Sequence, residues 1–245
     1  MKAAILRLDA VQMSFGSVIV DQHGFTDSFP GVAMLTGLIG NALGYDHSDF
    51  AKLTDLQERL DFAARWDVDP EEMVDYHTVD LGSPKMRNPG WTTSGEPEHR
   101  AGGPAARYGI HQRYRHYLVD GLMTVAVGLT TEGDPDLQTV VHALREPVRP
   151  LFLGRKTCLP SRPLLDPRTP VMEGEDLLSI LARVPIWTRS GQEAKGRCYT
   201  RACWTPRSFE DTAPETRLVY DLRDWQNQLP AGSRKRCEGM IEVGL

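Results

Sequence analysis

The chain has 245 residues, of which 40% are hydrophobic, and carries a formal net charge of -5. Its mean hydropathy of -0.37 suits a chain that buries a core, which excludes disorder throughout. No apolar run is long enough to span a bilayer, and charges interrupt the first twenty residues, so we expect a cytoplasmic protein with no membrane partner. Four cysteines are too few to cross-link a chain of this size, which predicts reduced thiols.

Apolar spacing predicts short strands and amphipathic helices along most of the chain. The opening order of strand, helix, helix and strand predicts an α+β fold. In chain order the predicted elements are a strand at 3–8 with a turn at 12–16, a buried helix at 35–43 ended by Gly44, a surface helix at 50–60, strands at 62–68 and 73–79, a strand or strand pair at 117–130, helices at 136–145 and 177–184, and strands at 198–204 and 217–222.

Residues 81–110 differ from their surroundings. They contain many glycines and prolines and hardly any aliphatic side chains, so they cannot build a core of their own. Because periodic sequence resumes on both sides, this segment is predicted to be a long loop or extended hairpin that projects from a domain.

Charge is unevenly distributed along the chain. Residues 46–80 are mainly acidic, whereas 85–116 and 183–207 are mainly basic. Most of the cations are arginines, which suit bidentate contacts with phosphates and stacking on bases. The alternative interpretation is that these segments are solvated loop faces.

A glycine followed by two cations stands out at 149–160. An apolar triplet precedes Gly154, and Arg155 and Lys156 follow it. A glycine permits a sharp bend or a close approach, and the two cations could then reach a phosphate. A second glycine-rich element, 35–44, follows Phe29-Pro30.

Aromatic residues interleave with arginines around the projecting segment. Such a composition is typical of a surface that binds single-stranded RNA. The alternative is that Tyr114 and Tyr117 face a core while the arginines are only hydrated. The aromatic residues are Trp91, Tyr108, Tyr114 and Tyr117, and the arginines are Arg107, Arg113 and Arg115.

Catalytic and metal-binding patterns are weak. Cys198 and Cys203 lack the paired spacing of a zinc site, and neither a nucleophile elbow nor a phosphate-binding Walker loop is present, so no metal or cofactor is expected. A histidine general base that cleaves RNA at a ribose 2′-hydroxyl without metal is chemically possible, with Tyr76, His77 or His116 as candidates. A structural or RNA-contacting histidine is the alternative and the preferred interpretation.

Five motifs in order resemble the CasD family, a subunit of type I-E CRISPR Cascade in the RAMP superfamily. The resemblance runs from Ala3 to about Leu165 and is carried by the set rather than by any single motif. The motifs are 6–8 with 12–16, Phe29-Pro30 before 35–44, 75–79, 113–118 before a Thr-Val-Ala strand, and 151–158.

The resemblance implies a ferredoxin-like, RRM-related palm at 1–160 with an inserted β-hairpin thumb at about 81–112, followed by a small C-terminal subdomain at 161–245. It implies a non-catalytic protein of antiviral defence that binds the 5′ handle of the crRNA within a ribonucleoprotein complex. The implied partners are a backbone subunit, the large subunit and nearby target DNA. The related type I-C member cleaves precursor crRNA, which makes a metal-independent endoribonuclease the alternative function.

Residues for RNA binding follow from the resemblance and from the basic patterns together. They are Gln12, Met13, Phe15, Arg107, Arg113, Tyr114, Arg115, Gly154, Arg155 and Lys156. One departure concerns Gly31-Val32-Ala33, where the family commonly has a basic, hydroxylic triplet. A phosphate contact there is either missing or supplied by backbone amides at the helix N-terminus, which shifts the weight to Arg155 and Lys156.

Overall fold

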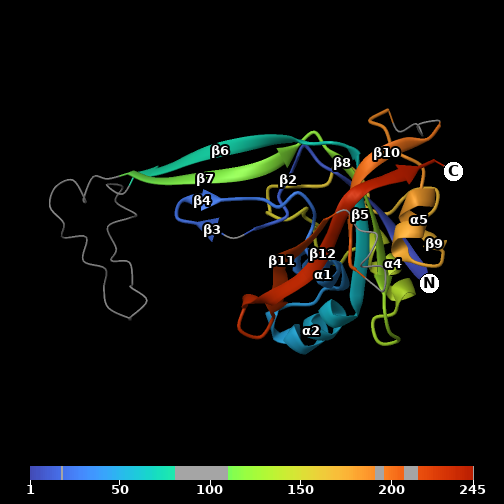
Figure 1. The fold of residues 1–245 in the computed structure, drawn as a ribbon. Coiled ribbons are helices and arrows are strands. Elements are labelled where there is room, and N and C mark those ends of the chain that lie inside the picture. Colours follow the sequence, from blue (N-terminus) through green and yellow to red (C-terminus); the bar gives the residue numbers. More distant parts are fainter. Residues whose placement is uncertain (18, 81–109, 191–195, 207–214, 245) are drawn as a thin grey trace.

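The structure is a computed structural model that describes residues 1–17, 19–80, 110–190, 196–206 and 215–244. It confirms the predicted α+β class (Figure 1). The strands are β1 (Lys2–Asp9), β2 (Gln12–Met13), β3 (Ile19–Val20), β4 (His23–Gly24), β5 (Leu60–Val68), β6 (Glu71–Asp80), β7 (Ile110–Val119), β8 (Leu122–Leu129), β9 (Val171–Glu173), β10 (Cys198–Trp204), β11 (Glu215–Asp224) and β12 (Leu229–Val243). The helices are α1 (Val32–Leu43), the 3-10 turn η1 (His47–Asp49), α2 (Phe50–Arg59), α4 (Leu137–Arg145) and α5 (Leu177–Arg183).

A seven-stranded sheet forms the centre, in the order β11-β12-β10-β5-β8-β1-β9. Four of these strands, β9-β1-β8-β5, with α1 and α4 between them in the chain, have the βαββαβ arrangement of a ferredoxin-like palm. β9 lies after residue 160, and β10, β11 and β12 extend the same sheet beyond β5. The sheet therefore runs across the predicted domain boundary at residue 160.

The central strands are buried on both faces, because both faces are covered by helices. Leu6 and Val125 belong to one core together with apolar residues of α1, α2 and α4. Ile5 and Ala126 belong to a second core together with α5. This explains why β1 and β8 read as continuous apolar runs rather than as an alternation.

Buried charges tie the segment after residue 160 to the palm. Arg7, 3% exposed, binds Asp67 at 2.9 Å and Asp166 at 2.7 Å, and Arg65, fully buried, binds Asp67 at 2.8 Å. Arg65 also donates to the backbone oxygen of Val184 at 2.7 Å. Removal of one member would leave an unpaired buried charge, so β1, β5 and the chain around 166–185 are held together.

The β6–β7 hairpin continues outward from β5 and β8 and projects from the body of the molecule (Figure 1). The bounds of about 81–112 expected for the thumb are narrower than the hairpin, whose strands begin at Glu71 and end at Val119. Residues 81–109, which include most of the predicted thumb, lie outside the described residues. No helix among the described residues is long and apolar enough to cross a membrane.

Candidate functional site

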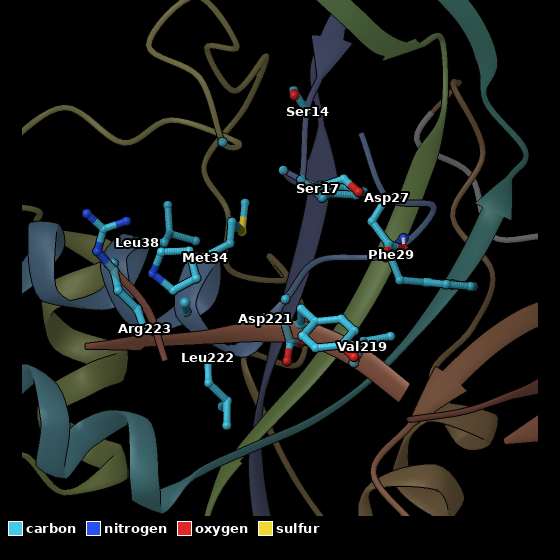
Figure 2. Close-up of a pocket in the computed structure, with 18 of the residues that line it drawn as sticks. Ser14, Ser17, Asp27, Phe29, Met34, Leu38, Val219, Asp221, Leu222 and Arg223 are labelled. Atoms are coloured by element: carbon cyan, nitrogen blue, oxygen red, sulfur yellow. Dashed lines mark hydrogen bonds between the residues drawn. The ribbon is translucent and has the colours of Figure 1, made fainter. Parts of the chain in front are cut away.

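A cleft of about 910 Å³ lies between two walls, with α1 as its floor. One wall is formed by residues 14–17 and 152–156, and the other by β11 of the C-terminal hairpin. Figure 2 shows Ser14 and Ser17 on one side of this cleft and the side chains of β11 across from them. The cleft thus brings together the two glycine-containing elements that the sequence singled out.

Gly154 permits the first wall to form. Its φ is +99°, and a Cβ at this position would overlap the carbonyl of Ser14. The backbone N–H of Ser14 donates to Leu153 O at 3.1 Å, and the N–H of Leu153 donates to Cys158 O at 2.8 Å. The prediction of a close approach at this glycine is confirmed, and the group that approaches is the protein's own backbone.

Arg155 and Lys156 occupy different environments. The Arg155 guanidinium donates to His116 O at 2.9 Å and to Gly24 O at 2.8 Å, and it lies 4.8 Å from the centre of the Tyr117 ring. It therefore fastens the loop to the base of the β6–β7 hairpin. Lys156 is exposed and makes no hydrogen bond or ion pair with any residue in the described part of the chain.

The second wall provides a cap for α1. Gly31, the N-cap residue that precedes this helix, has no side chain to offer, and Asp221 of β11 accepts a hydrogen bond from Val32 N at 3.0 Å. Asp221 is held in turn by Arg234, whose Nη2 lies 2.7 Å from its Oδ2. The Val32 amide, one of the groups that could have replaced the missing basic triplet, is therefore already used by a carboxylate of the protein.

Two further arginines of the hairpin contrast in burial. Arg236 is 1% exposed and binds Asp27 at 2.8 Å and Glu238 at 2.6 Å. Burial disfavours its charge, but the hydrogen bond and charge of Asp27 and the hydrogen bond to Glu238 outweigh burial and raise the pKa of Arg236. Arg217 is half-exposed, and its contact with Glu238 is longer, at 3.5 Å.

Rings line one face of the projecting hairpin. Tyr114 stacks on His23 with ring centres 4.7 Å apart and contacts Tyr76 at 4.9 Å, and Phe25 and His116 extend this row. Tyr117 is 2% exposed, so for this residue the core-facing interpretation is correct. Arg107, Trp91 and Tyr108 lie outside the described residues.

Arg113 and Arg115 are exposed on the opposite face from that row, because neighbouring residues of a strand point to opposite faces. Arg113 donates to Asp21 O at 3.1 Å. Gly24, opposite Arg115 in the register, contacts Arg155 on this same face. Arg155 therefore lies on the same face of the hairpin as Arg115.

Comparison with known proteins decides the family. A family model described as CRISPR-associated protein (Cas_Cas5) matches residues 4–237. The chain belongs to this family. It is 30% identical over 168 residues to the CRISPR system Cascade subunit CasD of Escherichia coli (strain K12), a match that covers 65% of this chain and 68% of that protein. The resemblance to CasD drawn from the motifs is thus confirmed.

Solved structures agree on the fold of this Cas5-family chain. A chain of a CRISPR RNA-guided surveillance complex matches with a TM-score of 0.67 and 23% identity, covering 98% of this chain and 90% of that one. A second structure, titled as the crystal structure of a Cas protein, matches with a TM-score of 0.59 and 22% identity, covering 99% and 95%. These matches support the α+β fold described above.

Three residues from the segment 12–16 were predicted to bind RNA in this Cas5-family chain. Met13 is fully buried and Phe15 is 5% exposed, so both side chains pack in the core, and Phe15 also lines the cleft. Gln12 is partly exposed and donates to Thr157 O at 3.4 Å, next to Lys156. Met13 supports the wall from the core, and RNA binding by this segment stays a prediction.

The alternative catalytic residues do not form one constellation. His77 binds Asp75 with 2.5 Å between Nε2 and Oδ2, on the hairpin face opposite Tyr76. Tyr76 is half-exposed at the edge of the row of rings. His116 lies in that row, where its Nε2 is 3.3 Å from His23 Nδ1.

The cysteines are all free thiols. Burial raises the pKa of Cys203 to about 12, so this thiol stays protonated at neutral pH. Among the described residues no group of three or more His, Cys, Asp or Glu side chains is placed to hold a metal ion.

Sequence reasoning missed β12 and the contribution of β11 to the cleft. In the basic region 183–207, two of the described arginines pair outside the cleft, Arg189 with Asp120 and Arg201 with Asp69. β12 contains Pro230, Gly232 and a run of charges, which do not resemble a strand. An arginine every second residue at Arg234 and Arg236 was the one available signal.

Proposed function

We propose that this Cas5-family chain is a non-catalytic subunit of a CRISPR Cascade surveillance complex that binds the 5′ handle of the crRNA. In this role it would contact the backbone subunit and the large subunit, with target DNA nearby in the assembled complex. Membership of the family and the similarity to the Cascade subunit CasD support the assignment to the complex. The RNA site itself is proposed from the residues that line the cleft.

The observation that carries the RNA site is the position of Lys156 in the first wall. It is an exposed cation without a partner in the described part of the chain, and it lines a cleft large enough for a segment of single-stranded nucleic acid. Such a cation can contact a phosphate without first breaking an ion pair, so its contact is favourable and depends on salt.

The other predicted residues take distinct roles in this proposal. Gly154 allows the wall to close, and Arg155 mainly positions it by joining the wall to the hairpin. Arg113 and Arg115 extend the positive surface along the hairpin on the same face as Arg155. Tyr114 is on the other face of the hairpin, where it stacks on His23 and supports the hairpin instead of lining the cleft.

Replacement of Lys156 by Ala tests the proposal. Handle RNA from the repeat, labelled with a fluorophore, would be titrated with the full-length chain at several salt concentrations. We expect weaker binding and a slope of log affinity against log salt that is smaller in magnitude by about 0.7, the value for one phosphate contact on a single strand. Lys52→Ala is the matched control, because Lys52 is exposed on α2 and pairs with Asp49. Unchanged RNA binding by Lys156→Ala would disprove the assignment of Lys156 to the RNA site.

A metal-independent endoribonuclease is the second candidate. The observation in its favour is the 3.3 Å contact between the ring nitrogens of His23 and His116, since two histidines can act as acid and base on a ribose 2′-hydroxyl. Half-exposed Tyr76 belongs to the same row, where the Tyr114 ring lies between it and His23. His77 would take no part in this ribonuclease mechanism, because it is on the face of the hairpin opposite the row of rings.

Incubation of the pure chain with repeat RNA in EDTA separates the two functions. The non-catalytic proposal expects intact RNA. Clean cleavage that is abolished by His116→Ala but retained by His142→Ala, a change at an exposed histidine of α4, would establish the ribonuclease instead.

A further inference from the structure

We propose that the C-terminal hairpin β11–β12 is the second jaw of the RNA cleft, and that Arg217 and Arg223 bind the sugar–phosphate backbone opposite Lys156. This inference rests on the proposed RNA-binding function and adds to it a part of the chain that neither the motifs nor the resemblance included. It makes the C-terminal region a ligand-binding element.

The position of β11 is the first support. The side of this strand that faces α1 carries Asp221, whose carboxylate accepts from Val32 N, and Val219, which is 4% exposed. Arg217 is two residues before Val219 and so points to the same side. Arg223 lies beyond a register shift in the strand and lines the same cleft. Figure 2 shows Val219, Asp221 and Arg223 along this strand beneath Ser14 and Ser17.

The hairpin is also held rigidly enough to act as a jaw. Trp225, 7% exposed, contacts the face of α1 at Gly37, and its Nε1 donates to Gln57 of α2 at 3.2 Å. Gln57 also bonds the backbone N–H and O of Arg223 at 3.1 and 3.0 Å. A preorganised wall keeps most of the binding free energy that a loose segment would lose on ordering.

Charge distinguishes the arginines that hold the jaw from those that could bind a ligand. Arg236, which is buried, and Arg234, which is partly buried, neutralise Asp27 and Asp221, the acids that line the cleft. Glu238 binds Arg236 at 2.6 Å and reaches Arg217 only at 3.5 Å. The charge of half-exposed Arg217 is thus only weakly compensated.

Arg223 is the less exposed of the two proposed arginines. Its Nη2 donates to the backbone and side-chain oxygens of Gln228 at 3.2 and 2.8 Å, and its guanidinium carbon lies 5.5 Å from the centre of the Trp225 ring. These partners are neutral, and Arg223 makes no ion pair with any residue in the described part of the chain, so its charge is available to a phosphate in the cleft.

The test compares Arg217→Ala with Arg197→Ala. Both are arginines of the C-terminal region that contact one glutamate, since Arg197 pairs with Glu242 at 3.2 Å, but only Arg217 lines the cleft. With labelled repeat RNA and the full-length chain, we expect Arg217→Ala to weaken binding about tenfold. The salt slope should decrease in magnitude by about 0.7. Arg197→Ala should leave both unchanged.

Arginine footprinting supplies a second readout that needs no variant. Modification of the wild-type chain by phenylglyoxal, mapped by mass spectrometry, should decrease at Arg217 when RNA is added and stay constant at Arg197.

The outcomes separate the two proposals. If Lys156→Ala weakens RNA binding but Arg217→Ala behaves like Arg197→Ala and Arg217 is not protected, the second jaw is disproved and the proposed function stands. If the wild-type chain binds no repeat RNA, the proposed function fails and the jaw fails with it.

Discussion

The two walls of the cleft are built in opposite ways. The wall at 152–156 is determined locally, because one glycine with positive φ allows the chain to pass against Ser14 and leaves Lys156 exposed. The wall at β11 is determined by distant partners, since Asp221 caps a helix 189 residues earlier in the chain and depends on Arg234 to stay there. A local wall can be recognised from a short motif, whereas the distant wall becomes visible only when the chain is folded.

The largest effect is expected from Gly154→Ala in the local wall. A Cβ would overlap the Ser14 carbonyl in a backbone conformation that alanine also disfavours, so we expect the free energy of unfolding to fall by about 3 kcal/mol or more. Denaturant unfolding measures this change. Gly16→Ala is the control, because Gly16 also has positive φ, at +78°, but nothing lies within 4 Å of its Cβ position, and about 1 kcal/mol is expected. Equal losses in the two variants would show that the close approach at Gly154 has no energetic importance.

Asp221→Ala is expected to have the next largest effect, on the distant wall. It removes the cap of α1 and leaves Arg234 without its carboxylate, so unfolding should become easier by about 2–3 kcal/mol. Glu242→Ala breaks an exposed pair with Arg197 and should change stability by less than about 0.5 kcal/mol. Thermal unfolding of both variants measures the difference. Similar values would mean that the β11 wall is held by packing alone.

The smallest change in the free energy of unfolding is expected from acid, through Asp166, which follows the 152–156 wall in the chain. Burial works against its charge, but the backbone N–H of Thr169 and the Arg7 guanidinium outweigh it and hold the pKa of Asp166 below its usual 3.8. Its contribution to stability is therefore complete above that usual value and is lost as the pH falls through the lower pKa of the folded state. Asp166→Asn should flatten this part of the curve of unfolding free energy against pH. An unchanged acid limb would show that the carboxylate is not stabilised as described.

Much of the palm was predictable from the sequence for physical reasons. Apolar runs on β1, β5 and β8 and the helical spacing on α1 and α4 reflect burial directly, and Gly44 ends α1 in the left-handed conformation expected of it. β12 was not predictable, because its pairing with β10 and β11 overrides the poor strand propensity of its glycines and charges. The roles of Arg155 and Met13 could not be predicted either, because they depend on neighbours that are distant in the sequence.

The most direct test of the central claim is to map where RNA lies on the protein. Ultraviolet cross-linking of repeat RNA in the assembled complex, read by mass spectrometry, should give cross-links in 14–17, 152–156 and β11. Few cross-links are expected at Tyr76 and Phe25, which are exposed in the row of rings on the opposite face of the hairpin. Cross-links concentrated at Tyr76 and Phe25, with none in the cleft, would contradict the account.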